Sequence, residues 1–300
     1  MKYLIIGSGG VGGCIGAYLT KAGKDTTLIA RNAHLEAMKK GLILEDVKGN
    51  QELIPVKAME LKDYQEKADV IFLCVKGYSI ASILDEIKRV SNEKTIIIPI
   101  LNVYGTGDKL QKELSASVCD GCIYIASEIK EPGVILMKGD VFRIVYGLSS
   151  HKISPELKAI QKDLLESGIE AVLSENIQRD AFEKYAYISS AVTCGLYYHA
   201  TAGDMQKEGK ERELFKALNH EIELLASAMG IPFEKDMVKE NVAILDTLSP
   251  LSSTSMQRDI AQGKPSEIDG LIYEVGRLAD QYQIELPNFQ SIIAKLQRFC

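Results

Sequence analysis

The apolar residues in the first third of the chain gather in short runs separated by polar or glycine-rich stretches. Four runs are predicted strands: Tyr3–Ile6, Thr26–Ala30, Val70–Val75 and Thr95–Ile100. Largely apolar runs of this length are typical of strands that a sheet buries on both faces. Between them, Val11–Lys21 and Ser79–Val90 have the pattern of helices. Alternating strands and helices predict a parallel sheet with helices on both faces.

The pattern changes from strands to helices in the second half of the chain. Val134–Met137 and Phe142–Tyr146 are two further strand-like runs. Beyond about residue 175 three long helical periodicities dominate: Arg179–Leu196, Arg212–Met229 and Glu267–Tyr282. We therefore predict an α/β Rossmann-type dinucleotide-binding domain over residues 1–174, followed by an all-α substrate and catalytic domain over residues 175–300.

The length of the chain indicates the number of domains, and its net charge limits the classes of molecule that it binds. A chain of 300 residues is longer than one typical core fills, which agrees with two domains. A formal net charge of −6 and a pI near 5.4 argue against nucleic acid and anionic membranes as main partners. No apolar run approaches the ~18 residues of a membrane span, and the N-terminus reaches Gly7 too soon for a signal peptide. We expect a cytoplasmic protein.

The cysteines and histidines show no spacing typical of a metal site. Cys119 and Cys122 form a single C-x-x-C, which could be a redox pair or half of a zinc site. The residues around them have the pattern of a strand and not of a redox helix. The other cysteines and the four histidines are dispersed along the chain. We expect reduced thiols and no bound metal.

A glycine-rich loop follows the first predicted strand and opens the first predicted helix. It reads Gly7-Ser8-Gly9-Gly10-Val11-Gly12, a G-x-G-x-x-G pattern in the context that a dinucleotide site requires. Gly7 permits the tight turn, Gly9 lets the backbone approach a pyrophosphate, and Gly12 lets the helix pack closely on the strand. The N–H groups that begin the helix would bind the phosphates. These six residues are the predicted cofactor loop.

Arg31, at the end of the second predicted strand, indicates which dinucleotide is bound. NAD-specific sites usually carry Asp or Glu here, whereas an arginine suits the 2′-phosphate of NADP. No carboxylate follows until Glu36. We therefore predict NADPH as the cofactor. The alternative is a solvated arginine at the start of a surface helix.

Several motifs further along the chain resemble one enzyme family. They are Ala30-Arg31, Cys74-Val75-Lys76, Asn102 after a buried strand, Phe182-Glu183-Lys184, and the run Ser255-Met256-Gln257-Arg258-Asp259-Ile260 with Gly263 through Asp269. Together with the glycine loop they make the chain resemble the ketopantoate reductases (2-dehydropantoate 2-reductases) along nearly its whole length. The last motif is the most specific, because the spacing of Ser-Met, Asp, Gly and Glu-Ile-Asp is hard to obtain by chance.

The resemblance implies a role for individual residues. Lys184 would be the catalytic lysine and Glu267 a second catalytic residue that binds a substrate hydroxyl and lies near the cofactor. Asn102 would lie beside the nicotinamide and the substrate, Ser255 would bind the substrate carboxylate, and Lys76 would lie between cofactor and substrate. Hydride reduction leaves negative charge on the ketone oxygen, and a lysine ammonium can both stabilise and protonate it.

Each of these residues also has a purely structural interpretation. Lys184 could be a surface lysine whose carbon chain lies along apolar neighbours. Glu267 could simply favour the start of a helix through the helix dipole. Lys76 could be a charge at a strand end.

The chain departs from the family on the helix that carries the lysine. The family usually has asparagines four and eight residues after the catalytic lysine, on one helical face. This sequence has Ile188 and Val192 there. The nearby polar residues lie about one position (~100°) away from that stripe: Ser189, Ser190 and Thr193. We expect the substrate-facing side of this helix to be unusually apolar.

Together these observations predict NADPH-dependent reduction of a 2-oxo acid. Ketopantoate is the expected substrate and D-pantoate the product, in pantothenate and coenzyme A biosynthesis. One alternative is reduction of another branched 2-oxo acid or an imine. A second alternative is a non-catalytic regulator that senses NADP(H). The expected partners are the small-molecule substrate and, as a candidate assembly, a second copy of the chain.

Overall fold

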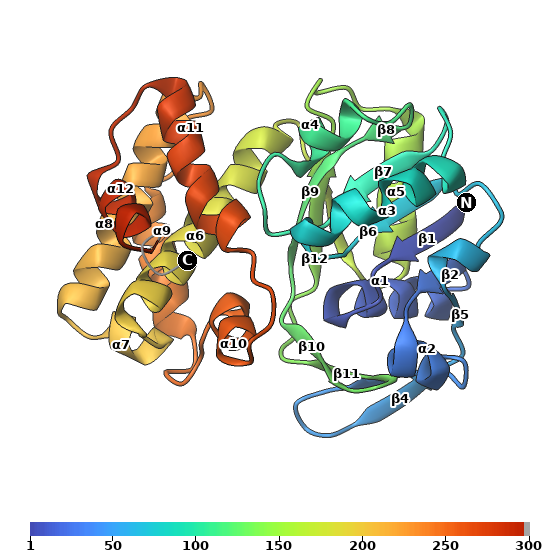
Figure 1. Ribbon diagram of the computed structural model, residues 1–300. Coiled ribbons are helices and arrows are strands. Elements are labelled where there is room, and N and C mark those ends of the chain that lie inside the picture. Colours follow the sequence, from blue (N-terminus) through green and yellow to red (C-terminus); the bar gives the residue numbers. More distant parts are fainter. Residues whose placement is uncertain (297–300) are drawn as a thin grey trace. The chain divides into compact units, whose positions relative to one another are not determined.

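The computed structural model describes residues 1–296, which fall into two compact units (Figure 1). The first unit comprises Met1–Leu101 and Gly105–Ile177. The second comprises the short segment Asn102–Tyr104 together with the chain from Gln178 onward.

The first unit is built on a six-stranded parallel sheet with the strand order β5-β2-β1-β6-β7-β8. Its strands are β1 (Lys2–Ile6), β2 (Asp25–Ile29), β5 (Lys57–Met59), β6 (Val70–Leu73), β7 (Ile96–Pro99) and β8 (Ser117–Val118). Every residue of β6 and β7 is buried, which confirms the prediction of strands covered on both faces.

Helices cover both faces of this sheet. They are α1 (Gly10–Lys21), α2 (Asn32–Met38), α3 (Ile80–Val90), α4 (Thr106–Gln111) and α5 (Pro155–Glu166), with the short 3-10 helices η1 (Leu61–Asp63) and η2 (Gly77–Ser79). Tyr3 and Ile5 of β1 share one core with Ile15 of α1, while Leu4 and Ile6 pack in a second core on the other face. Successive side chains of β1 therefore point to opposite faces of the sheet and pack in two different hydrophobic cores.

Two smaller sheets in the first unit were not predicted as separate sheets. One has the order β10-β11-β3-β4, with β3 (Leu42–Glu45), β4 (Gln51–Ile54), β10 (Ser127–Glu131) and β11 (Val134–Met137). The other has the order β13-β12-β9, with β9 (Asp120–Tyr124), β12 (Arg143–Gly147) and β13 (Glu170–Leu173). Both strand-like runs expected near residues 134–146 are strands, but long-range pairing places them in different sheets.

The second unit consists of helices and connecting loops throughout its described residues. The helices are α6 (Ile177–Tyr198), α7 (Ala202–Gln206), α8 (Lys210–Ala228), α9 (Met237–Thr247), α10 (Ser255–Ala261), α11 (Glu274–Tyr282) and α12 (Pro287–Leu296). Their core joins Phe182 and Ala186 of α6 to Phe215, Leu218 and Ile222 of α8. The predicted order, a Rossmann-type domain followed by an all-α domain, is confirmed.

The helix predicted over residues 267–282 contains a π-helical turn, Asp269–Tyr273, before α11. Hydroxyl groups of α6 reach two carbonyl groups of this turn. Tyr185 donates to Gly270 O across 2.8 Å, and Ser189 donates to Leu271 O across 2.7 Å. Such side-chain contacts with the backbone accompany local departures from α-helical geometry, and periodicity alone does not reveal them.

Within residues 1–296, no helix combines the length and the apolar character that a bilayer crossing demands.

Candidate functional site

Three neighbouring strands of the parallel sheet end level with one another at its carboxyl edge. Ile6 pairs with Ile29 on one side and with Leu73 on the other. The glycine loop follows β1, Arg31 follows β2, and Lys76 follows β6. Strands β2 and β5 lie on one side of β1, whereas β6, β7 and β8 lie on the other side. The strand order therefore changes direction at β1, and parallel α/β sheets bind ligands in the crevice at the carboxyl edge next to such a point.

The glycine loop turns sharply from β1 into α1. Gly7 has a φ of 99°, in the left-handed region that favours glycine. A Cβ on Gly12 would lie 2.3 Å from the carbonyl oxygen of Gly7, so the helix packs too closely on the loop for a side chain. Gly9, the N-cap residue of α1, has no described atom within 4 Å of the position its Cβ would take. The loop is packed at Gly7 and Gly12 and open at Gly9, as a phosphate-binding loop requires.

Ser8 adds a polar side chain to this loop. The residue is only 3% exposed, and its Oγ has no hydrogen-bond partner among residues 1–296. Its N–H donates to Ile29 O across 3.0 Å, which ties the loop to β2. An unsatisfied hydroxyl close to the first N–H groups of a helix fits the oxygens of a phosphate. The residues present therefore fit a dinucleotide pyrophosphate.

His34 of α2 holds the same loop and was not singled out in the sequence analysis. The N–H of Gly133 donates to His34 Nδ1 across 3.0 Å, so the ring proton lies on Nε2. His34 Nε2 then donates to the carbonyl oxygen of Ser8 across 2.8 Å. The histidine thereby bridges the glycine loop and the turn between β10 and β11. Sequence gave no sign of this bridge, because Gly133 lies 99 residues further along the chain.

Arg31 and Lys76 place two cations along the carboxyl edge of the sheet. Arg31 is exposed and has an extended backbone as the N-cap residue of α2. Glu36, the next carboxylate along the chain, bonds to Lys39 across 2.7 Å. Lys76 is half-buried and precedes η2. The end of β2 therefore presents an arginine where an NAD-specific site usually has a carboxylate.

In the helical unit, Lys184 meets Asn102 across 82 residues of sequence. Lys184 Nζ donates to Asn102 Oδ1 across 3.1 Å, and both residues are half-buried. The ring of Tyr104 lies 4.6 Å from that of Phe182 and 5.9 Å from that of Tyr185, measured between centroids. These aromatic contacts hold the segment Asn102–Tyr104 against α6. The structure thus brings Lys184 and Asn102, which belong to two separate sequence motifs, into direct contact.

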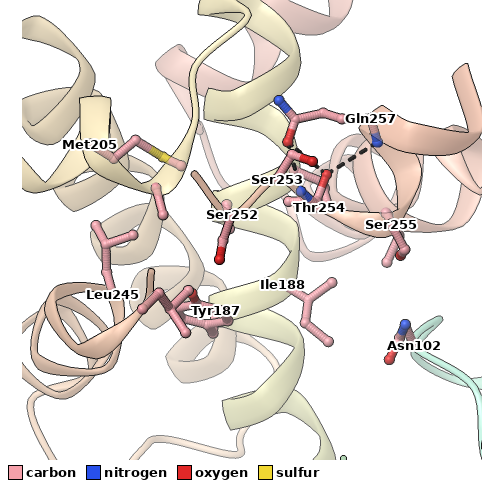
Figure 2. Close-up of a pocket in the computed structure, with 15 residues that line it drawn as sticks. Asn102, Tyr187, Ile188, Met205, Leu245, Ser252, Ser253, Thr254, Ser255 and Gln257 are labelled. Carbon is pink, nitrogen blue, oxygen red and sulfur yellow. Dashed lines mark hydrogen bonds between the residues drawn. The ribbon is translucent and has the colours of Figure 1, made fainter. Parts of the chain in front are cut away.

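A cavity of about 210 Å³ lies within the helical unit (Figure 2). Its lining residues are Asn102, Tyr187, Ile188, Ala191, Val192, Ala202, Met205, Leu245, Leu248, Ser252, Ser253, Thr254, Ser255, Gln257 and Leu271. Asn102 and Ser255, both predicted substrate-binding residues, are among them. The cavity therefore joins the residue bonded to Lys184 with the residue expected to bind a carboxylate.

The wall formed by α6 is mainly apolar. Ile188 and Val192 line the cavity one helical turn apart, with Ala191 between them. Ser189 is not a lining residue, and its hydroxyl donates to Leu271 O. Tyr187 adds a phenol whose pKa burial raises to about 12, so that it stays protonated near neutral pH. The residues that replace the family's asparagines thus face this cavity.

Gln257 organises the opposite, polar wall and had no assigned role in the sequence analysis. Its Nε2 donates to Gly195 O across 3.0 Å and to Ala200 O across 2.9 Å. Its Oε1 accepts from the N–H and the hydroxyl of Thr254, each across 2.9 Å. A Cβ on Gly195 would lie 2.8 Å from Gln257 Oε1. The carboxamide therefore ties the loop before α10 to the end of α6.

The other predicted site residues lie in different surroundings. Ser255 is exposed at the first turn of α10. Glu267 is only 8% exposed, and its carbonyl oxygen accepts from Leu271 N across 2.9 Å at the start of the π-helical turn. Within the described part of the chain, Glu267 does not line the 210 Å³ cavity. Lys76 belongs to the first unit. The roles expected of Glu267 and Lys76 stay predictions.

The C-x-x-C pair lies in strand structure, as the sequence indicated. Cys119 follows β8 and Cys122 is part of β9. Burial raises the pKa of the Cys119 thiol to about 12, which disfavours the reactive thiolate. Among residues 1–296, no group of three or more histidine, cysteine or acidic side chains is arranged to hold a metal ion.

Family models and individual relatives match both units of the chain. A model described as ketopantoate reductase PanE/ApbA matches residues 3–150, and its C-terminal counterpart matches residues 176–299. The "Uncharacterized oxidoreductase YkpB" of Bacillus subtilis is 26% identical and covers 100% of this chain and 99% of its own length. A 2-dehydropantoate 2-reductase of Mesorhizobium japonicum is 26% identical, covering 99% of this chain and 97% of its own.

A solved structure agrees with these matches. The PanE/ApbA family ketopantoate reductase of Ralstonia eutropha is 25% identical and superposes with a TM-score of 0.88, covering 99% of this chain and 97% of its own. The two family models together span most of both units, and they agree with the motifs and the fold. The chain therefore belongs to the ketopantoate reductase (PanE/ApbA) family of oxidoreductases.

Proposed function

We propose that this protein uses NADPH to reduce the carbonyl group of a 2-oxo acid to a hydroxyl group. The observation that carries the proposal is the hydrogen bond from Lys184 to Asn102, a lining residue of the cavity that also includes Ser255. A proton donor, an amide and a hydroxyl that can bind a carboxylate are thereby gathered at one site.

The bound nicotinamide would supply the hydride that adds to the carbonyl carbon. Residues of the protein must then stabilise the negative charge that develops on the carbonyl oxygen of the substrate. Lys184 carries an ammonium group that stabilises the alkoxide and transfers a proton to it, which completes the hydroxyl group. Asn102 orients that ammonium through the 3.1 Å hydrogen bond. Lys184 recovers its proton from water after the product forms.

The cofactor assignment rests on the carboxyl edge of the parallel sheet. The open backbone at Gly9, the unsatisfied Ser8 hydroxyl and the start of α1 suit a pyrophosphate. The exposed Arg31 at the end of β2 favours NADPH over NADH, because a guanidinium can pair with the 2′-phosphate.

Ketopantoate heads the list of substrates to test, because curated relatives such as the one in Mesorhizobium japonicum are named 2-dehydropantoate 2-reductases. Its reduction to D-pantoate would place the protein in pantothenate and coenzyme A biosynthesis. One observation favours the alternative of another branched 2-oxo acid, namely the apolar wall at Ile188 and Val192. The cytoplasmic location and the homodimer stay predictions.

Steady-state oxidation of NADPH in the presence of a panel of 2-oxo acids tests the proposal. We expect turnover with at least one member, and Lys184→Ala should lower kcat by about 10²–10⁴-fold, the usual contribution of a general acid or base. The affinity for NADPH should change little. Lys239→Ala, which removes an exposed lysine of α9, is the matched control and should retain full activity.

Two outcomes would contradict the proposal. Near-normal kcat in Lys184→Ala would make Lys184 an ordinary lysine at the protein surface. Tight NADPH binding without turnover of any 2-oxo acid would instead support the NADP(H)-sensing alternative.

A further inference from the structure

The hairpin formed by β10 and β11 packs against both α1 and α2 in the first unit (Figure 1). Its turn contains Gly133, and a Cβ on this residue would lie 2.7 Å from Ala37 Cβ of α2. A Cβ on Gly10, the first residue of α1, would lie 2.8 Å from Ser127 O of β10. The hairpin therefore touches α2 at its turn and touches the end of the glycine loop at its first strand.

His34 of α2 is a polar link between this hairpin and the glycine loop. The half-buried ring accepts at Nδ1 from the N–H of Gly133 across 3.0 Å. It donates from Nε2 to the carbonyl oxygen of Ser8 across 2.8 Å. Both ring nitrogens are used by backbone groups, 26 residues before and 99 residues after the histidine. Only a neutral ring with its proton on Nε2 satisfies both contacts.

The contact at Ser8 O also fixes the direction of a neighbouring N–H group. The peptide bond between Ser8 and Gly9 is planar and trans, so the Ser8 carbonyl and the Gly9 N–H point in opposite directions. The N–H of Ser8 donates to Ile29 O across 3.0 Å, which holds the preceding peptide group. The two peptide groups of Ser8 are thus anchored by β2 and by His34, and the Gly9 N–H is held in one orientation.

This anchoring affects binding because the loop is rich in glycine. Three of the four residues from Gly7 to Gly10 are glycines, and glycine loses more conformational freedom on ordering than any other residue. A ligand that has to order a mobile loop binds more weakly, whereas a loop already held in its binding conformation avoids this cost. An anchor on Ser8 O should therefore raise the affinity for a ligand of the loop.

We propose that His34 is a positioning residue of the cofactor site, which sets the Ser8–Gly9 peptide so that the Gly9 N–H is presented to the pyrophosphate. The inference rests on the proposed NADPH-dependent function, because it takes the glycine loop as the pyrophosphate site. His34 acts through the backbone of Ser8 and not by touching the cofactor. Its Nε2 governs cofactor affinity, whereas its Nδ1 attaches the hairpin through Gly133.

Two amide substitutions separate the contacts of the two ring nitrogens. In His34→Asn the amide oxygen takes the place of Nδ1 and can accept from the Gly133 N–H, but the side chain is too short to reach Ser8 O. In His34→Gln the longer amide takes the place of Nε2 and can donate to Ser8 O, whereas the Gly133 N–H loses its acceptor. We expect the dissociation constant of NADPH to rise about tenfold in His34→Asn and to stay within about twofold in His34→Gln.

Titrations with NADPH and with NADH distinguish positioning of the loop from an effect on Arg31. His34→Asn should weaken both cofactors by the same factor, because both carry the pyrophosphate, whereas Arg31→Ala should weaken mainly NADPH. KM for NADPH should rise with the dissociation constant, and kcat at saturating NADPH should change little. His220→Asn, at an exposed histidine of α8, is the matched control and should leave both affinities unchanged.

The outcomes separate the inference from the proposed function. A folded His34→Asn variant that binds NADPH as tightly as the unmutated protein would overturn the inference. Equal losses in the Asn and Gln variants would also overturn it, because the histidine would then serve the hairpin and not Ser8 O. A loss confined to NADPH would place the effect at Arg31 instead. If the unmutated protein binds neither cofactor, the proposed function itself fails.

A measurement on the unmutated protein decides the inference even if the variants do not fold. The chemical shifts of the two His34 ring nitrogens in a ¹⁵N NMR spectrum report which nitrogen carries the proton. We expect the neutral ring with its proton on Nε2, both with and without NADPH. A proton on Nδ1 would overturn the inference, because that nitrogen could not accept from the Gly133 N–H.

Discussion

The glycine loop and the helical cavity are built from different parts of the chain. Six consecutive residues make the loop, and it presents mainly backbone N–H groups and the start of α1. The cavity is formed by side chains from segments as far apart as Asn102 and Leu271. Backbone groups are the same in every residue, so the loop depends on the absence of side chains. The cavity depends on which side chains are present.

The glycine loop, which would bind the cofactor, relates to the type of reaction, whereas the helical cavity relates to the choice of substrate. The loop tolerates little change, because Gly12 has no room for a Cβ against the Gly7 carbonyl. The apolar face of α6 can exchange Ile188 or Val192 for another residue without altering the backbone of the helix. Members of one family can therefore keep the cofactor site and change the substrate.

Two alanine substitutions in the loop should have the largest effects and should separate folding from binding. In Gly12→Ala the new Cβ would lie 2.3 Å from a backbone oxygen. We expect a loss of about 1–3 kcal/mol in the free energy of unfolding and loss of NADPH binding. In Gly9→Ala the new methyl group has open space and an allowed backbone conformation, so stability should change little.

NADPH affinity should nevertheless fall by about 100-fold in Gly9→Ala, because the methyl group occupies the path of the pyrophosphate and displaces charge-assisted hydrogen bonds. Thermal unfolding and cofactor titration measure the two effects independently. Unimpaired NADPH binding by Gly9→Ala would show that the cofactor does not approach the loop at this residue.

Arg31 is the side chain expected to decide cofactor choice at the loop site, and its effect should be intermediate. One charge-assisted contact with the 2′-phosphate corresponds to about 10- to 150-fold preference for NADPH over NADH. Arg31→Ala should abolish most of that preference and leave kcat/KM with NADH nearly unchanged. Rising salt should weaken the preference of the unmutated protein, since Arg31 is exposed. Equal kcat/KM values for the two cofactors in the unmutated protein would exclude the assignment.

Gln257 should give the smallest of these effects and tests whether internal hydrogen bonds organise the cavity. Gln257→Leu removes the donors to Gly195 O and Ala200 O. We expect KM for the 2-oxo acid to rise by about tenfold, with NADPH affinity unchanged and kcat less affected, because the loop before α10 is no longer tied to the end of α6. Gln262→Leu, at an exposed position after α10, is the control. A loss of stability without a change in KM would limit Gln257 to a structural role.

Local patterns in the sequence were sufficient to predict most elements of the fold. The strands near residues 3, 26, 70 and 96 and the long helices α6 and α8 lie where hydrophobic spacing indicated. The two smaller sheets of the first unit were not predicted, because their strands pair across long distances in sequence, as β3 does with β11. Two carbonyl groups of the π-helical turn accept hydrogen bonds from Tyr185 and Ser189 of α6, and no local sequence pattern contains these contacts.

The sequence by itself determined the elements whose causes are local. Apolar runs define buried strands, and consecutive glycines define a loop that only a side-chain-free backbone can form. Only the tertiary structure decided that Lys184 bonds Asn102, that His34 supports Ser8, and that Gln257 joins two helices. These contacts join residues far apart in the chain, and their geometry exists only after the helices pack.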